Sequence, residues 1–337
     1  MGLLIVEGTI EIEQLWPHGE SDGDTTKVLV ERIAYAANED PASAALTTVF
    51  DGAKVRGRVT KAVIDQKGRI TIRWQGMDAP ELHYRAQAEV PKGDPMANVK
   101  KAAFRAVNKN YRQHLGETAT VKLHEKMQSL AGGADAIPCR VTTYVTTPNQ
   151  VFDTYGRFVG DVVVADGAGS DVNLNLWMLE NGWAFPTFYA SMRETEINAC
   201  LVAIKQAKGG GVWRHCSQDI STFDWNLVYD KLPFDAKVDA GPVLMPKVYR
   251  RQVAYRTNKK AKIIAGSFEA CLAAMDPPET YMRLDDFLTN GATAAPHRLF
   301  SELVKQGKFD ANPQELVFPE APSLLVDATG NRITKWL

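Results

Sequence analysis

Residues 69–81 read RITIRWQGMDAPE, and this stretch is the most informative part of the sequence about the fold. We interpret residues 69–74 as a β-strand, because the preceding Asp65-Gln-Lys-Gly68 is typical of a hairpin turn with glycine in its last position. Pro80 has no amide hydrogen for strand pairing, so the strand should end shortly before it. The stretch therefore predicts a strand that brings three charged residues to its end: Arg73, Asp78 and Glu81.

Further strands and helices are expected on both sides of this stretch. Strands are predicted over residues 3–14, 27–33, 59–64, 118–124, 137–146 and 158–165, and the 59–64 strand should pair with 69–74 across the turn. A four-residue spacing of apolar side chains predicts a helix over residues 96–115. Two more helices should begin near the capping residues Asp171 and Ser191. After residue 215 the pattern becomes irregular, with helical segments expected near 261–275, 280–288 and 296–306.

Composition describes an ordinary globular protein. The chain has 337 residues, of which 45% are hydrophobic and 23% charged, with a formal net charge of -1. This length suggests two domains, which we place at residues 1–216 and 217–337. The net charge gives no sign of a nucleic-acid partner, yet a local basic patch would be enough to bind one.

The termini and cysteines suggest a cytoplasmic protein without a membrane partner. The first residues, MGLLIVEG, lack the basic start and the long apolar run of a signal peptide. No apolar run is long enough to cross a bilayer. The four cysteines are far apart in sequence, which favours free thiols in a reducing compartment.

Acids and arginines at expected strand ends form the main candidate site. Two carboxylates can hold a hard cation such as Ca²⁺ through oxygen atoms, and a third can orient or deprotonate a water molecule. Two arginines can hold a phosphate and stabilise the extra negative charge of a five-coordinate transition state. The residues available for these roles are Asp24, Arg73, Asp78, Glu81 and Arg157.

Their spacing resembles the staphylococcal nuclease (thermonuclease) family. The motif R-x4-D-x-P-E is present at residues 73–81, D-x-Y-G-R at 153–157, and Asp-Gly-Asp-Thr at 22–25. VNLNLWMLENGWA at 172–184 and Gly-Val-Trp at 211–213 also match. These pieces occur in the family's order, and the resemblance covers roughly residues 5–215.

The resemblance implies a fold and an activity. The expected fold is α+β: an OB-like five-stranded barrel with three helices, followed by a smaller α+β domain. The implied activity is Ca²⁺-dependent hydrolysis of DNA or RNA, and an OB barrel favours single-stranded or melted substrate. By position, the resemblance implies metal binding by Asp24, Asp78 and the carbonyl of Ala79, general base catalysis by Glu81, phosphate binding by Arg73 and Arg157, and nucleotide contacts by Tyr155, Phe188 and Tyr189.

The sequence also departs from the family pattern. Asp24 and Arg73 are 49 residues apart (73 − 24), which requires a long inserted loop. Asp51, inside that loop, is an alternative to Asp24 as the first metal ligand, but its Asp-Gly-Ala-Lys context does not match the motif. Thr154 stands where the family usually has a basic residue, which concerns nucleotide contacts and not the reaction itself.

A basic segment follows the resemblance region. Residues 240–268 contain seven lysines and arginines and no acid, with two tyrosines between them. We interpret this segment as a nucleic-acid-binding arm that includes Lys247, Arg250 and Arg251. The alternative is that this basic segment is a solvated surface or faces a protein partner and does not bind nucleic acid.

Two other functions stay open. The chain could be a catalytically inactive nuclease-like module that binds nucleic acid or protein. The C-terminal region could also recruit the protein to a protein partner.

Overall fold

The computed structural model describes residues 1–14, 21–57, 59–167, 169–229, 239–320 and 323–336. Its main feature is a closed barrel of five strands, β1 (Gly2–Glu11), β2 (Thr25–Ala36), β6 (Arg69–Trp74), β8 (Ala136–Val145) and β9 (Phe158–Ala165). β1 pairs with β2 and β8, β8 with β9, β9 with β6, and β6 with β2. All these pairs are antiparallel except β6–β9. The expected OB-like barrel and α+β class are confirmed.

The barrel closes over a tightly packed interior. Gly8 lies at an irregularity in the β1–β2 pairing, where a Cβ would come within 2.1 Å of the Leu29 carbonyl oxygen. The glycine therefore permits the strands to approach and bend at this point. Side chains from all five strands fill the interior, among them Leu4, Val28, Ile72, Trp74, Val141 and Phe158.

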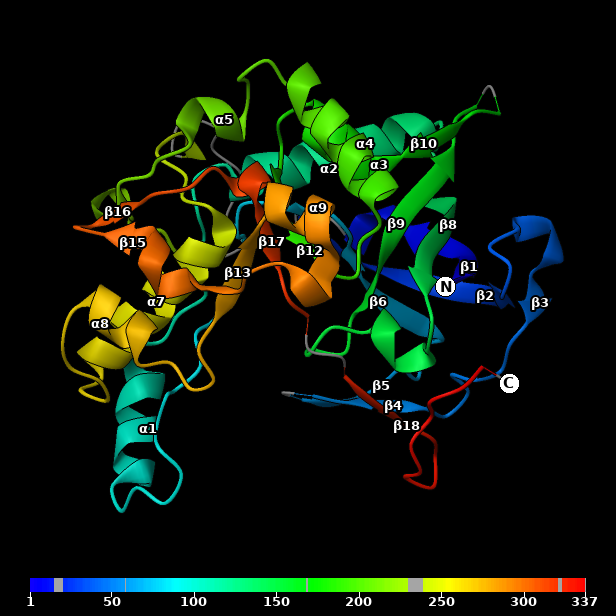
Figure 1. The fold of residues 1–337 in the computed structure, drawn as a ribbon. Coiled ribbons are helices and arrows are strands. Elements are labelled where there is room, and N and C mark those ends of the chain that lie inside the picture. Colours follow the sequence, from blue (N-terminus) through cyan, green and yellow to red (C-terminus); the bar gives the residue numbers. More distant parts are fainter. Residues whose placement is uncertain (15–20, 58, 168, 230–238, 321–322, 337) are drawn as a thin grey trace.

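Helices cover the barrel and extend away from it (Figure 1). Those before residue 216 are α1 (Ala97–Val107), α2 (Gly116–Leu130), α3 (Leu174–Glu180), α4 (Glu194–Gln206) and α5 (Val212–His215). Later ones are α7 (Pro246–Lys260), α8 (Phe268–Ala273) and α9 (Leu284–Ala294). None of the helices in the described ranges is long and apolar enough to cross a membrane.

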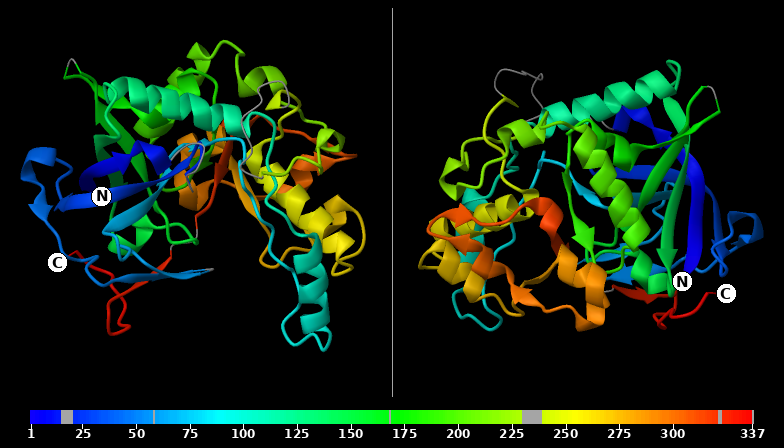
Figure 2. Two further views of the ribbon diagram at one scale, coloured as in Figure 1. Left: turned by 180° about the vertical axis from the view of Figure 1, so that it is seen from behind. Right: turned by 45° about the horizontal axis from the view of Figure 1, so that its top comes forward.

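The region after residue 216 packs closely against the barrel and its insertions. β17 (Leu316–Phe318) pairs with β12 (Phe188–Tyr189) and β13 (Thr280–Arg283), and β18 (Leu324–Val326) pairs with β4 (Lys54–Arg56). A second hydrophobic core joins α1 to α7 and α8, so these elements lie together at one end of the molecule in all views (Figures 1 and 2). The proposed division at residue 216 stays a prediction.

The remaining strands are short. They are β3 (Ala45–Leu46), β5 (Thr60–Ala62), β7 (Met77–Asp78), β10 (Asp171–Asn173), β11 (Phe185–Pro186), β14 (Arg298–Leu299), β15 (Val304–Lys305) and β16 (Lys308–Phe309). β5 pairs with β4, so the expected pairing of residues 59–64 with 69–74 is wrong. The turn at Asp65–Gly68 is present, but the two segments enter different sheets.

Other expectations about secondary structure also require correction, among them the helical segment expected near residues 296–306, where the structure has β14, a short 3-10 turn and β15. Residues 118–124 form part of α2 and not a strand. The buried face of α2 includes Ala119, Leu123 and Met127, which are spaced four residues apart as in a helix. This repeat extends beyond residues 118–124, the segment that suggested a strand. The predicted helix over 96–115 ends at Val107 in α1, and residues 280–283 form β13 ahead of α9.

Candidate active site

The Asp-Gly-Asp turn before β2 supplies the first carboxylate. Gly23 packs so closely on Ala79 that a Cβ there would lie 2.6 Å from the Ala79 Cβ. Thr25 Oγ1 donates to Asp24 Oδ1 at 3.0 Å, and Trp74 N donates to the Asp24 carbonyl oxygen at 2.9 Å. Asp24 is therefore held in a buried position beside the end of β6.

β6 and β7 supply the next two groups. Arg73 is the penultimate residue of β6, and Asp78 ends β7, which pairs with β11. Asp78 is fully buried, and its Oδ1 lies 3.6 Å from Arg73 Nη2. Arg73 Nη2 is itself buried and makes no hydrogen bond to any residue that the structure describes. It is thus a donor available to an anion.

Glu81 is fixed through its backbone. Its amide donates to Gln113 Oε1 at 3.0 Å, and the Gln113 amide donates to the Glu81 carbonyl oxygen at 2.7 Å. Gly116, at the start of α2, also packs on this carbonyl. Gln113 was not among the expected site residues, and no local motif marks it.

The turn at residues 153–157 positions the second arginine. Asp153 Oδ1 accepts hydrogen bonds from the amides of Tyr155 and Arg157, and its Oδ2 accepts from Arg157 Nε at 2.8 Å. Arg157 Nη1 donates to Thr25 Oγ1 at 2.9 Å, which places it next to Asp24. The Tyr155 ring lies 5.7 Å from the Arg157 guanidinium. The five residues expected from the sequence are thus brought together.

The carboxylates strongly influence one another. Burial raises the pKa of Asp24, and the negative charges of Asp22 and Asp78 raise it further. Burial acts in the same direction on Asp78, but Arg250 and then Arg73 outweigh it and lower its pKa below the usual range. Burial also raises the pKa of Glu81, against the opposing effect of Arg250. An additional cation would therefore be stabilised between Asp24 and Asp78.

The donor chemistry fits a hard divalent cation. Asp24 and Asp78 offer carboxylate oxygens, and Ala79 offers a buried backbone carbonyl next to them. In the described part of the chain, however, no group of three or more histidine, cysteine, aspartate or glutamate side chains is arranged to hold a metal. Besides Arg73 and Arg157, a third cationic group contacts the carboxylates of this site.

That third group is Arg250 of α7, which sequence reasoning had assigned to a nucleic-acid-binding arm. Its Nη2 lies 2.7 Å from Asp78 Oδ2 and its Nη1 lies 3.1 Å from Asp78 Oδ1, while Nη1 also contacts Glu81 Oε1. The sequence separation is 172 residues. The only sequence signal was the acid-free run around Arg250, and it carried no information about the partner.

The other expected arm residues also have internal partners. Lys247 Nζ lies 2.7 Å from Glu279 Oε1, and Arg251 makes two hydrogen bonds to the same carboxylate. Although burial opposes them, Lys247 and Arg251 lower the pKa of Glu279 to about 2. The predicted role of these residues in binding nucleic acid stays a prediction.

The other two expected aromatic contacts, Phe188 and Tyr189, differ in exposure. Phe188 is fully buried in the core, where β12 meets β17. Tyr189 is half-buried, and its ring lies 5.6 Å from the Arg73 guanidinium. Of the pair, Tyr189 is the residue positioned to meet a ligand at the site.

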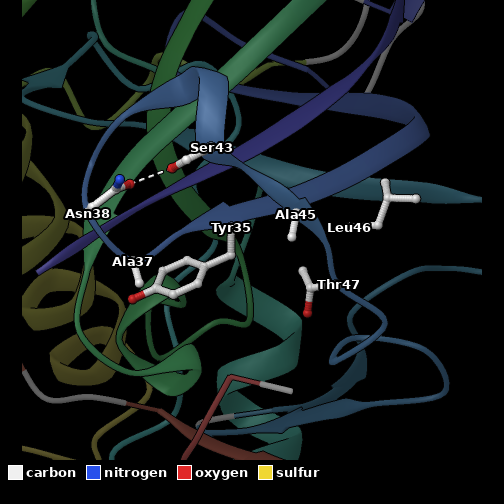
Figure 3. A pocket seen from close by; sticks show the side chains of 7 residues that line it. All are labelled: Tyr35, Ala37, Asn38, Ser43, Ala45, Leu46 and Thr47. Atoms are coloured by element: carbon white, nitrogen blue, oxygen red, sulfur yellow. Dashed lines mark hydrogen bonds between the residues drawn. The ribbon is translucent and has the colours of Figure 1, made fainter.

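A hollow of about 350 Å³ lies apart from these residues, at the edge formed by β2 and β3 (Figure 3). The hollow is lined by Tyr35, Ala37, Asn38, Ser43, Ala45, Leu46 and Thr47. None of these lining side chains is charged. None of the candidate catalytic residues lies there.

Geometry and comparison agree on the class of domain. The structure has a closed OB-like barrel with carboxylates and arginines gathered at the end of β6, in the segment that follows it, and at the starts of β2 and β9. Residues 71–215 match the family model described as staphylococcal nuclease homologue, so this part of the chain is similar to that family. The match includes Arg73, Asp78, Ala79, Glu81 and Arg157, whereas Asp24 precedes it. A search of curated proteins finds no match.

Proposed function

We propose that this protein is a cation-dependent nuclease that hydrolyses phosphodiester bonds of DNA or RNA. The observation that carries the proposal is the convergence of Asp24, Asp78 and Glu81 with Arg73 and Arg157 at one place on the barrel. Carboxylates for a cation and a base, together with arginines for a phosphate, are the groups that this reaction requires.

Each residue has a distinct task in the proposed reaction. Asp24, Asp78 and the Ala79 carbonyl would hold Ca²⁺, which supplies positive charge next to a bound phosphate. Arg73 would donate to a phosphate oxygen through its buried Nη2, which makes no hydrogen bond to any described residue. Arg157, which directly precedes β9, would donate hydrogen bonds to the same phosphate.

Glu81 acts as the base in this scheme. It accepts a proton from the attacking water, or orients that water, as the water oxygen bonds to phosphorus and the bond from phosphorus to the leaving sugar oxygen breaks. The arginines stabilise the extra negative charge on the phosphoryl oxygens. Burial favours this role because a raised pKa makes the carboxylate a better proton acceptor. Tyr155 and Tyr189, each next to one of the arginines, would contact the nucleotide.

The test is a cleavage assay on single-stranded DNA, double-stranded DNA and RNA, with Ca²⁺, Mg²⁺ or a chelator. We expect cleavage with Ca²⁺, fastest on single strands because their bases can stack on aromatic side chains. The chelator should abolish it. Cleavage at the same rate in chelator would contradict the cation-dependent reaction.

The second candidate function is a module that binds nucleic acid without cleaving it. It is favoured by the contacts of Arg250 with Asp78 and Glu81, which neutralise two of the catalytic carboxylates. Binding without cleavage under every cation tested, and without any rise in melting temperature on addition of Ca²⁺, would support this alternative.

The end of α7 is a candidate surface for the nucleic-acid strand. Tyr255, Arg256, Lys259 and Lys260 line a hollow of about 430 Å³, and both lysines are exposed. Lys260 lies ten residues after Arg250, so the helix axis runs about 15 Å from the active site to this hollow. A basic hollow with aromatic neighbours suits a single strand that leaves the site.

Changing both exposed lysines to glutamate should weaken binding of single-stranded DNA. We expect Lys259→Glu with Lys260→Glu to reduce affinity about tenfold at low salt, and to lower the slope of log affinity against log salt by about 1.4, at about 0.7 per phosphate contact. Fluorescence anisotropy at several salt concentrations measures both. The matched control is Lys205→Glu with Lys208→Glu, exposed lysines in and just after α4. Equal effects of the two double variants would argue against a specific arm.

A further inference from the structure

Arg250 makes the contacts expected of an active-site residue, although it comes from the C-terminal region. Its guanidinium spans both oxygens of Asp78 and also contacts Glu81. Asp78 is fully buried, and the side chains of Glu81 and Arg250 are 13% and 21% exposed. These are the carboxylates that the proposed reaction uses as metal ligand and base.

Hydrogen bonds just before the start of α7 and near its end set the position of Arg250. Before the helix, Gln113 Nε2 donates to the Leu244 carbonyl oxygen at 2.8 Å, and Gln113 is the residue that holds the Glu81 backbone. Near its end, buried Asn258 donates to the Gln87 carbonyl oxygen and accepts from the Glu89 amide, both at 2.9 Å. α7 is therefore tied to the segment that follows Glu81, and Arg250 reaches the carboxylates from a fixed helix.

A guanidinium and a metal ion have conflicting requirements at this place. A cation bound by Asp78 needs at least one of its carboxylate oxygens, and Arg250 engages both. The two positive groups would also lie within a few ångströms of each other in a buried setting, where their repulsion is weakly screened. Either group can satisfy Asp78, but both together are disfavoured.

We propose that Arg250 is a further residue of this active site and sets its affinity for divalent cations by competing for Asp78 and Glu81. The inference rests on the proposed function only in taking Asp78 as a cation ligand. When a cation binds, Arg250 leaves Asp78, and its contact with Glu81 is released as well. By reciprocity, a docked Arg250 weakens cation binding by the same factor by which the cation weakens the Arg250 contact.

The experiment measures Ca²⁺ binding by titration calorimetry without nucleic acid, so it does not depend on activity. Three full-length proteins are compared: the wild type, Arg250→Met, and Arg256→Met as the matched control. Methionine keeps the apolar part of the side chain and removes the charge. Arg256 lies on the same helix with its guanidinium 5.0 Å from the Phe223 ring, so its variant reports the effect of removing charge alone.

Arg250→Met is expected to bind Ca²⁺ at least tenfold more tightly than the wild type, with Arg256→Met within about twofold of it. Equal affinities in all three proteins would overturn the inference, and so would absence of binding in all three. Arg250→Lys serves if the methionine variant does not fold, because a single ammonium cannot bridge both oxygens of Asp78 as a guanidinium does. Its affinity should lie above that of the wild type, and an unchanged value overturns the inference.

The outcome is separable from that of the proposed function. If the wild type cleaves nucleic acid with Ca²⁺ while all variants bind Ca²⁺ equally, the nuclease proposal stands and the role of Arg250 falls. If Arg250→Met gains affinity but no protein cleaves any substrate, the cation site and its competitor stand and the nuclease proposal falls.

Discussion

Replacing Glu81 with glutamine is expected to slow nucleic-acid hydrolysis by about 10²- to 10⁴-fold, the usual contribution of a general base. Glutamine has nearly the same shape but cannot accept the proton of the attacking water. The backbone of residue 81 is held by Gln113 and would not be disturbed, so the variant should fold normally. The measurement is the single-turnover cleavage rate on single-stranded DNA with saturating Ca²⁺.

The control for this prediction is Glu125→Gln, which removes an exposed carboxylate paired with Lys122 on α2. Its cleavage rate should match that of the wild type. If Glu81→Gln cleaves as fast as this control, Glu81 is not the base and the proposed mechanism fails.

The largest expected loss of stability follows from replacing Asp239 with alanine. Asp239 is fully buried; its Oδ1 accepts a hydrogen bond from Arg112 Nη1 at 2.7 Å, and its Oδ2 accepts from the amide and hydroxyl of Thr118 in the first turn of α2. Removing it leaves the Arg112 charge buried, with Glu117 as a more distant neighbour at 3.4 Å. Breaking a buried pair in this way costs about 3–5 kcal/mol of unfolding free energy.

Urea denaturation followed by circular dichroism measures this loss. Asp171→Ala is the matched control, because Asp171 pairs with Arg140 at the surface, where both side chains are largely exposed. Exposed pairs contribute about 0–1 kcal/mol. A similar midpoint for the two variants would show that the contact between residue 239 and α2 contributes little to stability.

The barrel strands could be anticipated because their signals are local, whereas the closed barrel was expected from the family resemblance. Turns, strand ends and motifs such as residues 73–81 and 153–157 depend on neighbours in sequence, and the structure keeps them as expected. The candidate carboxylates and arginines could be anticipated because each belongs to a short sequence motif: Asp24, Arg73 and Arg157 lie at or next to ends of barrel strands, and Asp78 and Glu81 follow β6.

Helix α7 could not be anticipated from an apolar pattern. Its buried face includes Gln252, Thr257 and Asn258, which are polar. Thr257 Oγ1 donates to the Val253 carbonyl oxygen inside the helix, and Asn258 donates to the Gln87 carbonyl oxygen outside it. Burial of Asn258 depends on partners at Gln87 and Glu89, which lie far from the helix in sequence. A pattern of apolar residues therefore gives no sign of how this helix is oriented.

By itself, the sequence determined the barrel strands, the turns that carry the catalytic-type residues, and the family resemblance, because the patterns that indicate them lie in short stretches of the chain. Only the tertiary structure decided that Lys247 and Arg251 would pair with Glu279, and that Arg250 would reach Asp78 and Glu81. A charge attracts any opposite charge, so sequence alone cannot choose its partner. Packing of α7 against the segment after Glu81 makes that choice.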